Sequence, residues 1–211
     1  MKTRRAKTPE RIVAGASARF LAQGFSRVTM DRLAADLGVS KKTLYRHFAS
    51  KEQLLYAVVT RFLEETTASV DAILKGPGHD LPDKLTALMD FMGRRLSGVS
   101  LVFLEELERH APDMWREVQE FRRRRITENI LKLYRTGRRQ GLFAPEPDPR
   151  LTAHLFLTLV QGAINPQALS RIPYPPSQVI RAVITIFLHG TLAGDTRLAR
   201  QKKNRSPEVR I

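Results

Sequence analysis

Apolar residues recur along this chain of 211 residues with the spacing of an α-helix. Near the N-terminus, Ile12, Ala16 and Phe20 lie four residues apart, so their side chains share one helical face. Thr8 is suited to cap this helix and Gly24 to end it. The pattern predicts a first helix between these two residues.

Two short helices and a tight turn follow. Thr29 is suited to cap the second helix, and Gly38 to end it. The apolar residues of this helix fall at i, i+3, i+4 and i+7: Met30, Leu33, Ala34 and Leu37. Ser40 then caps a third helix that begins at Lys41. The sequence therefore predicts two short helices that meet at a glycine.

A fourth helix and a helical body complete the pattern. Ser50 and Gln53 form a capping box at the start of the fourth helix, which continues to about Lys75. Clusters of proline and glycine separate five further helices, predicted at 83–97, 100–110, 113–140, 149–170 and 177–193. Pro166 must end or kink the helix at 149–170. The sequence thus predicts an all-α fold of about nine helices.

The third helix lies in the stretch GVSKKTLYRHF, residues 38–48, which has few apolar anchors. Leu44 and Phe48 are four residues apart and mark the inward face. The outward residues carry charge or hydrogen-bonding groups: Lys41, Lys42, Tyr45 and Arg46. Two short helices around a glycine turn, the second with a basic outer face, are typical of a helix-turn-helix, whose second helix enters the DNA major groove. A solvated helix without a ligand is the alternative.

The run TMDRLAADLGVSKKTLYRHFASKEQLL carries an almost complete family pattern. With the preceding helix included, residues 8–56 resemble the DNA-binding domain of the TetR (tetracycline repressor) family of bacterial transcription regulators. The resemblance implies an N-terminal helix-turn-helix DNA-binding domain and a C-terminal helical domain for ligand binding and dimerisation. It implies a regulator, more often a repressor than an activator, that binds a palindromic operator as a homodimer and is released by a small ligand.

The resemblance also assigns DNA contacts position by position. Four residues resemble the phosphate-contacting set of the family: Thr29, Tyr45, His47 and Lys51. Five others sit where family members place base-reading or groove-lining groups: Ser40, Lys41, Lys42, Thr43 and Arg46. Lys42 departs from the pattern, because many members have glycine there. A lysine at this position is able to reach guanine or to hold a phosphate, so the base preference stays open.

The last two predicted helices are apolar on almost every face, which is more than one helix buries within its own domain. We interpret them as a four-helix dimer interface, built from two helices of each subunit, which resembles the usual arrangement in the family. The residues assigned to this interface are Leu155, Leu159, Ile180, Ile184 and Phe187. The alternative is a helix pair deep in the core of a monomer.

A small-molecule pocket in the body is likewise implied by the resemblance. The candidate lining residues are apolar or adaptable, with two polar members: Met89, Met92, Phe103, Leu107, Trp115, Tyr134, Phe156, His110 and Gln161. Few acids and several aromatic rings favour an apolar or aromatic ligand, although each residue is also a plain core candidate. The run RRRR at 122–125 is interpreted as a solvated helix face whose arginines pair with Glu117, Glu120 and Glu128.

The charge distribution favours a basic head on a nearly neutral body. The net charge is +15, from 36 Lys and Arg against 21 Asp and Glu. Residues 1–51 hold 12 basic and 3 acidic side chains, residues 52–193 hold 18 and 16, and residues 194–211 hold 6 and 2. We assign the first segment to the DNA-binding domain, the second to ligand binding and dimerisation, and the third to a basic, flexible tail.

The composition argues against several other functions. The chain has no cysteine, so it offers no disulfide framework, thiolate metal site or cysteine nucleophile. No secretory signal or membrane-spanning run is apparent, which favours the cytoplasm. No catalytic motif is recognisable, so we expect no enzyme, cofactor or metal. Two alternatives stay open: a non-specific DNA-binding or structural protein, and a regulator of the same fold without a small-molecule inducer.

Overall fold

The computed structural model describes residues 8–76, 81–143 and 148–191. Over these residues the chain folds into ten helices, which confirms the predicted all-α class. The basic tail predicted at 194–211 lies outside the described residues.

The helices begin and end close to the predicted positions. Their bounds are α1 Thr8–Gln23, α2 Met30–Asp36, α3 Lys41–His47, α4 Lys51–Lys75, α5 Leu81–Ser97, α6 Leu101–His110, α7 Pro112–Arg139, α8 Pro149–Ala163, α9 Pro166–Leu169 and α10 Pro176–Thr191. The helix predicted at 149–170 is two helices, because Pro166 lacks the N–H that would continue α8 and instead begins α9. Asn165 caps α9 by accepting a hydrogen bond from the Ala168 N–H at 2.8 Å.

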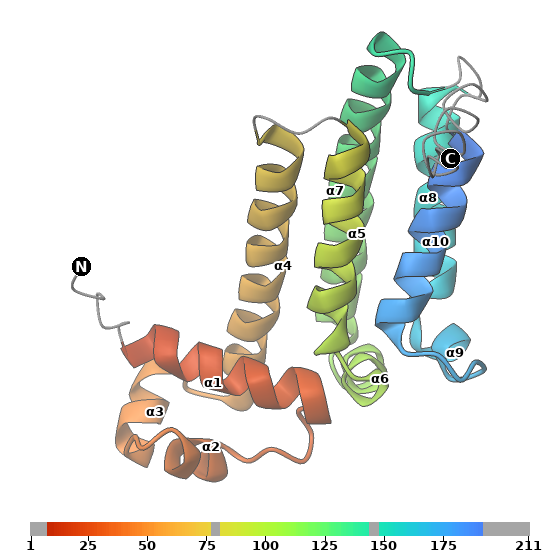
Figure 1. Cartoon of the computed structure of the whole chain (residues 1–211). Helices are drawn as coiled ribbons and strands as arrows, with labels where there is room; N and C mark the ends of the chain where they lie inside the picture. The colour runs from red at the N-terminus through yellow and green to blue at the C-terminus, as the bar shows by residue number, and fades with distance from the viewer. Residues whose placement is uncertain (1–7, 77–80, 144–147, 192–211) are drawn as a thin grey trace, which may run out of the picture.

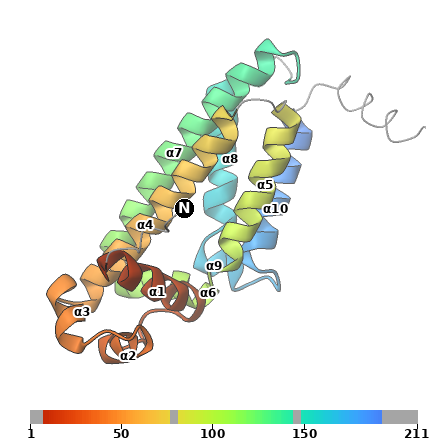
Figure 2. The ribbon, with the colours of Figure 1, turned by 60° about the vertical axis from the view of Figure 1, so that its left-hand side comes forward.

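The first three helices form a small unit at one end of the molecule, and the longer helices stand beside one another in the body (Figure 1). α4 joins the two parts, because it packs against α1 and also against α5 and α7. α6 lies at the junction, in contact with α1 and with α7 and α9 (Figure 2). The head is therefore connected to the body by α4 and by α6.

Two apolar clusters hold these parts together. The first contains Phe20, Leu33 and Leu44 of the head and extends to Leu107 of α6. The second lies within the body, where Tyr134, with 1% of its surface exposed, packs against Phe143 with ring centroids 5.3 Å apart. Because the first cluster crosses from the head into α6, the head does not pack as an independent unit.

Two side-chain caps fix the short helices of the head, as the sequence predicts. Thr29 Oγ1 accepts a hydrogen bond from the Arg32 N–H at 3.2 Å, and Ser40 Oγ accepts one from the Thr43 N–H at 3.0 Å. Between these caps, Gly38 has φ 63°, a left-handed conformation that glycine adopts without strain. These bonds set where α3 begins and hence which of its residues face outward.

The buried anchor of α3 gives a stability prediction. Leu44 has no exposed surface, so Leu44→Ala leaves a cavity and lowers the free energy of unfolding by about 2–5 kcal/mol. The exposed neighbour Lys42 serves as the control, with an expected change for Lys42→Ala within about 0.5 kcal/mol. Urea denaturation followed by circular dichroism measures both. Equal losses in the two variants would contradict the inward orientation of Leu44.

Candidate functional site

The outer face of α3 presents the predicted DNA-reading groups to solvent. Lys41, Lys42, Tyr45 and Arg46 are exposed, while Leu44 of the same helix is fully buried. The phenol of Tyr45 is 46% exposed, although aromatic side chains are usually more enclosed. The helix thus has one anchored side and one cationic side.

The cations of this face differ in their internal partners. Lys41 Nζ donates to Asp31 Oδ2 at 2.5 Å, so α2 holds this lysine. For Lys42 and Arg46, no ion pair is formed with the described part of the chain. These two side chains are therefore the cations of α3 most available to an external anion.

Lys51, predicted to contact phosphate, has a structural role that the sequence does not show. Its Nζ donates to the backbone carbonyls of Phe25 and Ser26, both at 3.1 Å. It also lies 6.0 Å from the centroid of the Phe25 ring. An ammonium group has three donors, so two are occupied inside the protein and its contact with a phosphate stays a prediction. Of the other predicted phosphate contacts, Thr29 is exposed and His47 is half-buried.

The loop between α1 and α2 is held from a second side by α6. Glu106 Oε2 accepts hydrogen bonds from the N–H groups of Phe25 and Ser26, at 2.5 and 2.8 Å. The approach is close, because a Cβ atom on Gly24 would lie 2.6 Å from that oxygen. Gly24 also has φ 83°, a backbone conformation that favours glycine, and a Cβ atom there would displace the Glu106 carboxylate. We name this set of contacts, Glu106 with residues 24–26, the loop clamp.

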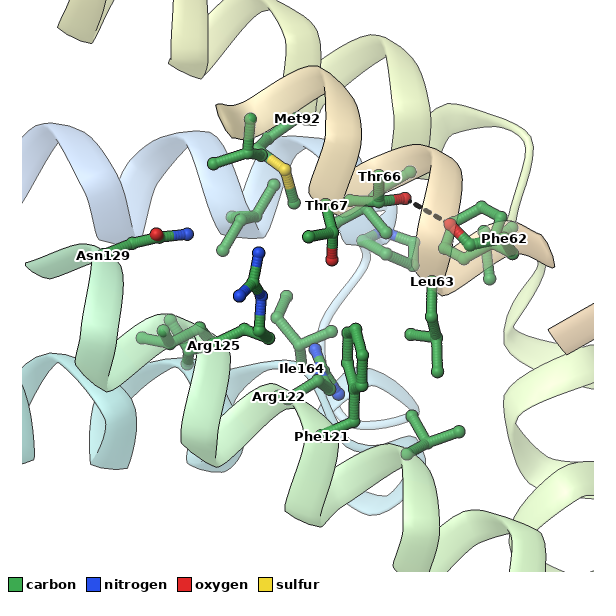
Figure 3. A pocket seen from close by; sticks show the side chains of 18 of the residues that line it. Phe62, Leu63, Thr66, Thr67, Met92, Phe121, Arg122, Arg125, Asn129 and Ile164 are labelled. Atoms are coloured by element: carbon green, nitrogen blue, oxygen red, sulfur yellow. Dashed lines mark hydrogen bonds between the residues drawn. The ribbon is translucent and has the colours of Figure 1, made fainter. Parts of the chain in front are cut away.

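The body contains a cavity of about 240 Å³. Its wall is built mainly from apolar residues of α4, α5, α6, α7, α8 and α10. Figure 3 shows Phe62, Leu63 and Thr67 of α4 on one side, opposite Phe121 and Arg125 of α7. Two of the helices that line the cavity, α4 and α6, therefore also connect the body to the head.

The sequence predicted part of this wall. The predicted residues that line the cavity are Met92, Phe103, Leu107, Trp115 and Phe156. The other four do not line it, which corrects the prediction for their location. His110 is exposed at the end of α6, and Gln161 of α8 is not among the lining residues. Tyr134 is enclosed against Phe143. Met89 Sδ accepts a hydrogen bond from Thr185 Oγ1 at 3.7 Å.

The arginine run at 122–125 is divided between solvent and cavity, which corrects its interpretation as a solvated face. Arg123 and Arg124 are exposed, and Arg123 pairs with Glu120 at 2.5 Å. Arg122 and Arg125 instead line the cavity. A signal for this was present, because the cavity residues of α7 recur every three or four positions: Trp115, Val118, Arg122, Arg125 and Asn129.

The predicted dimer residues fall on two different sides of their helices. Leu155 and Leu159 of α8 are 49% and 47% exposed. Ile180 and Ile184 are buried within the subunit, because this face of α10 belongs to the core of the body, and the Phe187 ring packs 4.6 Å from Phe156. Ile180 and Ile184 are therefore not exposed for the predicted dimer interface, whereas Phe187 is half-buried and its assignment stays a prediction. Among the described side chains of the two helices, the large apolar residues that are exposed are Leu151, Leu155, Leu159 and Ile186, which we name the α8/α10 face.

Across residues 8–76, 81–143 and 148–191, no group of three or more His, Asp or Glu side chains is arranged to hold a metal ion. No helix in the same residues is both long and apolar enough to cross a membrane.

A short basic helix, held outward by a glycine turn at the end of a helical body, defines a DNA-binding protein of the helix-turn-helix class. Residues 12–58 match the bacterial regulatory proteins of the tetR family. Residues 12–58 therefore form a DNA-binding domain of the TetR family, and the proteins that the chain resembles over most of its length include transcriptional regulators of this family.

Its similarity to other proteins extends over most of its length. YvaF, an uncharacterized HTH-type transcriptional regulator of Bacillus subtilis, is 24% identical over 173 residues, or 82% of this chain and 90% of YvaF. The nucleoid occlusion factor SlmA of Vibrio vulnificus is 28% identical over 168 residues, or 74% of this chain and 81% of SlmA. The crystal structure of a TetR transcriptional regulator from Chloroflexus aurantiacus has 25% identity and a TM-score of 0.64, over 88% of this chain and 97% of that one. None of the three is named as an enzyme.

The loop clamp gives a testable prediction. Glu106→Ala leaves the N–H groups of Phe25 and Ser26 without their acceptor, which costs about 1–3 kcal/mol of unfolding free energy. Amide hydrogen exchange in the α1–α2 loop should become faster at the same time. Glu108→Ala on the same helix is the control, since Glu108 contacts neither N–H group. Unchanged exchange in Glu106→Ala would show that the clamp does not hold the loop.

Proposed function

We propose that this protein is a homodimeric repressor that binds a palindromic operator in the cytoplasm and is released from it by a small ligand. The supporting observation is the continuity of α6. Phe103 and Leu107 of this helix line the cavity, and Glu106, between them, holds the loop that begins the helix-turn-helix. A ligand that displaces α6 would therefore also displace the head.

The DNA contacts that we propose divide into two kinds. Tyr45, Thr29, His47 and Lys51 are phosphate-contacting residues, and Ser40, Lys41, Lys42, Thr43 and Arg46 line the major groove. The exposure of Tyr45, Lys42 and Arg46 supports this division. Of the cations, Lys42 and Arg46 are the best candidates for reading bases, because Lys41 is paired with Asp31.

The α8/α10 face is the surface that we propose for dimerisation. Leu151, Leu155 and Leu159 follow one another at four-residue spacing along α8, and Ile186 of α10 is 68% exposed. An apolar stripe of this kind is stable in water only when it is covered. A two-fold pairing of α8 and α10 would place two identical heads on one side of the dimer, as a palindromic operator requires.

The proposed domain division follows from these roles. Residues 1–51 would read DNA, and residues 52–193 would bind the ligand and dimerise. Because one apolar cluster joins Phe20 and Leu44 of the first segment to Leu107 of the second, we expect the two segments to move relative to one another only when this junction is repacked. That cost is the means by which ligand binding would be coupled to DNA affinity, typically by about 1–3 kcal/mol.

A regulator of the same fold without an inducer is the second candidate. It is favoured by the similarity to the nucleoid occlusion factor SlmA, whose name includes no small molecule. The two candidates differ in what fills the cavity of about 240 Å³. In the second, no ligand changes the affinity for DNA.

Selection of random duplex DNA by the purified protein, at near-physiological salt, tests the proposed DNA-binding mode. We expect enrichment of one inverted repeat with half-sites about 34 Å apart, or a multiple of that spacing. Salt-sensitive binding without enrichment would instead identify a non-specific DNA-binding protein.

Two substitutions on α3 separate phosphate contacts from base contacts. Tyr45→Phe removes one hydroxyl donor and should weaken binding to all duplexes by a similar factor. Lys42→Ala should weaken binding to the selected repeat by about 1–3 kcal/mol more than to a scrambled duplex. Fluorescence anisotropy with both duplexes measures the difference. If Lys42→Ala weakens both equally, Lys42 holds a phosphate and does not read a base.

The dimer interface is tested by a charge on the α8/α10 face. Leu155→Glu should convert the dimer to monomers, because two glutamates would be buried near the two-fold axis. Val102→Glu is a matched control, since Val102 on α6 is 47% exposed against 49% for Leu155. Sedimentation equilibrium measures the mass of each variant. A dimer that survives Leu155→Glu would place the interface elsewhere.

A further inference from the structure

One charged group in the cavity wall has no counter-charge. Arg122 extends from α7 among apolar side chains, next to Phe121 and Ile164 (Figure 3). It forms no hydrogen bond or ion pair with the described part of the chain. The described residues that line the cavity include Arg122 and Arg125 but no aspartate or glutamate. The interior of the body therefore holds a cation that the protein does not neutralise.

Arg122 is charged at neutral pH despite its surroundings. Burial disfavours the charged form and lowers the pKa of Arg122 to about 10. That value is well above pH 7, so the guanidinium keeps its proton in the folded protein. The Arg122 side chain is half-buried, so its guanidinium keeps some access to the open space of the cavity. An unpaired cation in a largely apolar wall is still costly, and part of that cost is recovered when an anion binds beside it.

The neighbouring Arg125 of α7, unlike Arg122, has carboxylate partners. Arg125 donates to Glu128 Oε2 at 3.1 Å and to Asp71 Oδ2 at 3.4 Å. Its Nε and Asn129 Oδ1 remain buried without a hydrogen-bond partner. Arg122, Arg125 and Asn129 share one face of the helix because they are three and four residues apart. The cavity thus has a donor-rich patch on α7 within an otherwise apolar wall.

We propose that the cavity binds an amphipathic organic anion, whose carboxylate pairs with Arg122 and whose apolar part fills the rest of the space. This inference rests on the proposed ligand response and specifies the class of ligand. The shape of the guanidinium supports a carboxylate, because its planar fork donates two parallel hydrogen bonds to the two carboxylate oxygens. An alkyl phosphate offers a related anion, but it carries more charge and more acceptors than one free arginine satisfies.

The size and lining of the cavity limit the apolar part. A volume of about 240 Å³ holds roughly eight water-sized groups at about 30 Å³ each. Met92 and Phe156 contribute adaptable and aromatic surfaces, which suit a short alkyl chain or a single ring. A carboxylic acid of about eight carbons is the appropriate size.

The chain carries its own reporter for this binding. Trp115 lines the cavity and is the single tryptophan of the sequence. Its fluorescence in the full-length protein is titrated with octanoate, octyl phosphate and 1-octanol, which share one alkyl chain and differ in the head group. We expect octanoate to bind at least tenfold more tightly than 1-octanol, and more tightly than octyl phosphate. Equal affinity for octanoate and 1-octanol would overturn the proposal, and a preference for octyl phosphate would overturn the assignment of a carboxylate.

Variants at Arg122 identify the group responsible. Arg122→Met keeps the length of the side chain without its charge and should lose the preference for octanoate over 1-octanol, while Arg122→Lys should keep a reduced preference. Arg124→Met is the matched control, since Arg124 is exposed on the same helix, and it should bind like the unchanged protein. A preference that survives in Arg122→Met would overturn the role of Arg122.

Two additional measurements distinguish a folding defect from a loss of binding, and the ligand class from the proposed release mechanism. Thermal unfolding of Arg122→Met should occur at an equal or higher temperature, because an unpaired charge has been removed from a largely apolar wall, and this confirms that the variant is folded. The selected DNA repeat is then added to the octanoate-bound protein. If octanoate binds through Arg122 but DNA affinity does not change, the ligand class stands and the proposed release mechanism fails. If none of the three compounds binds, the ligand class itself is wrong.

Discussion

The loop that precedes the helix-turn-helix is held to α6 by a single carboxylate. Glu106 accepts two backbone hydrogen bonds from the loop that precedes α2, while Lys51 donates to the carbonyls of the same two residues from the opposite side. The loop is thereby held between α6 and α4. Backbone groups bound in this way follow the helices that bind them, so the orientation of α3 is set by the body and not by the head alone.

The body is built in a way that makes this connection sensitive to what the cavity contains. α6 supplies apolar side chains to the cavity wall and Glu106 to the loop clamp, so it serves both sites. α7 supplies Arg122, a cation without a partner among the described residues. An anion bound there would stabilise the arrangement of helices that best encloses it, and by linkage it would change the affinity for DNA.

The sequence predicted the local structure well because capping and apolar spacing act over a few residues. Thr29, Ser40 and Ser50 begin helices where their side chains predict. It predicted the cavity less well, since the side of α7 that faces inward depends on contacts with distant helices. Arg122 and Arg124 are both arginines of the run at 122–125, so the sequence does not distinguish them. The packing of α7 places Arg122 in the cavity wall and Arg124 in solvent. The two hydrogen bonds of Lys51 to the α1–α2 loop could not be predicted either, because they join segments that are distant in the sequence.

The central claim is that the cavity and the DNA-reading surface are energetically coupled. The most direct measurement is the dissociation constant of octanoate, from Trp115 fluorescence, in the absence and in the presence of saturating selected DNA. Coupling between two binding sites is reciprocal. If octanoate weakens DNA binding by some factor, saturating DNA must weaken octanoate binding by the same factor, here about 5–150-fold. An identical dissociation constant with and without DNA would contradict the account.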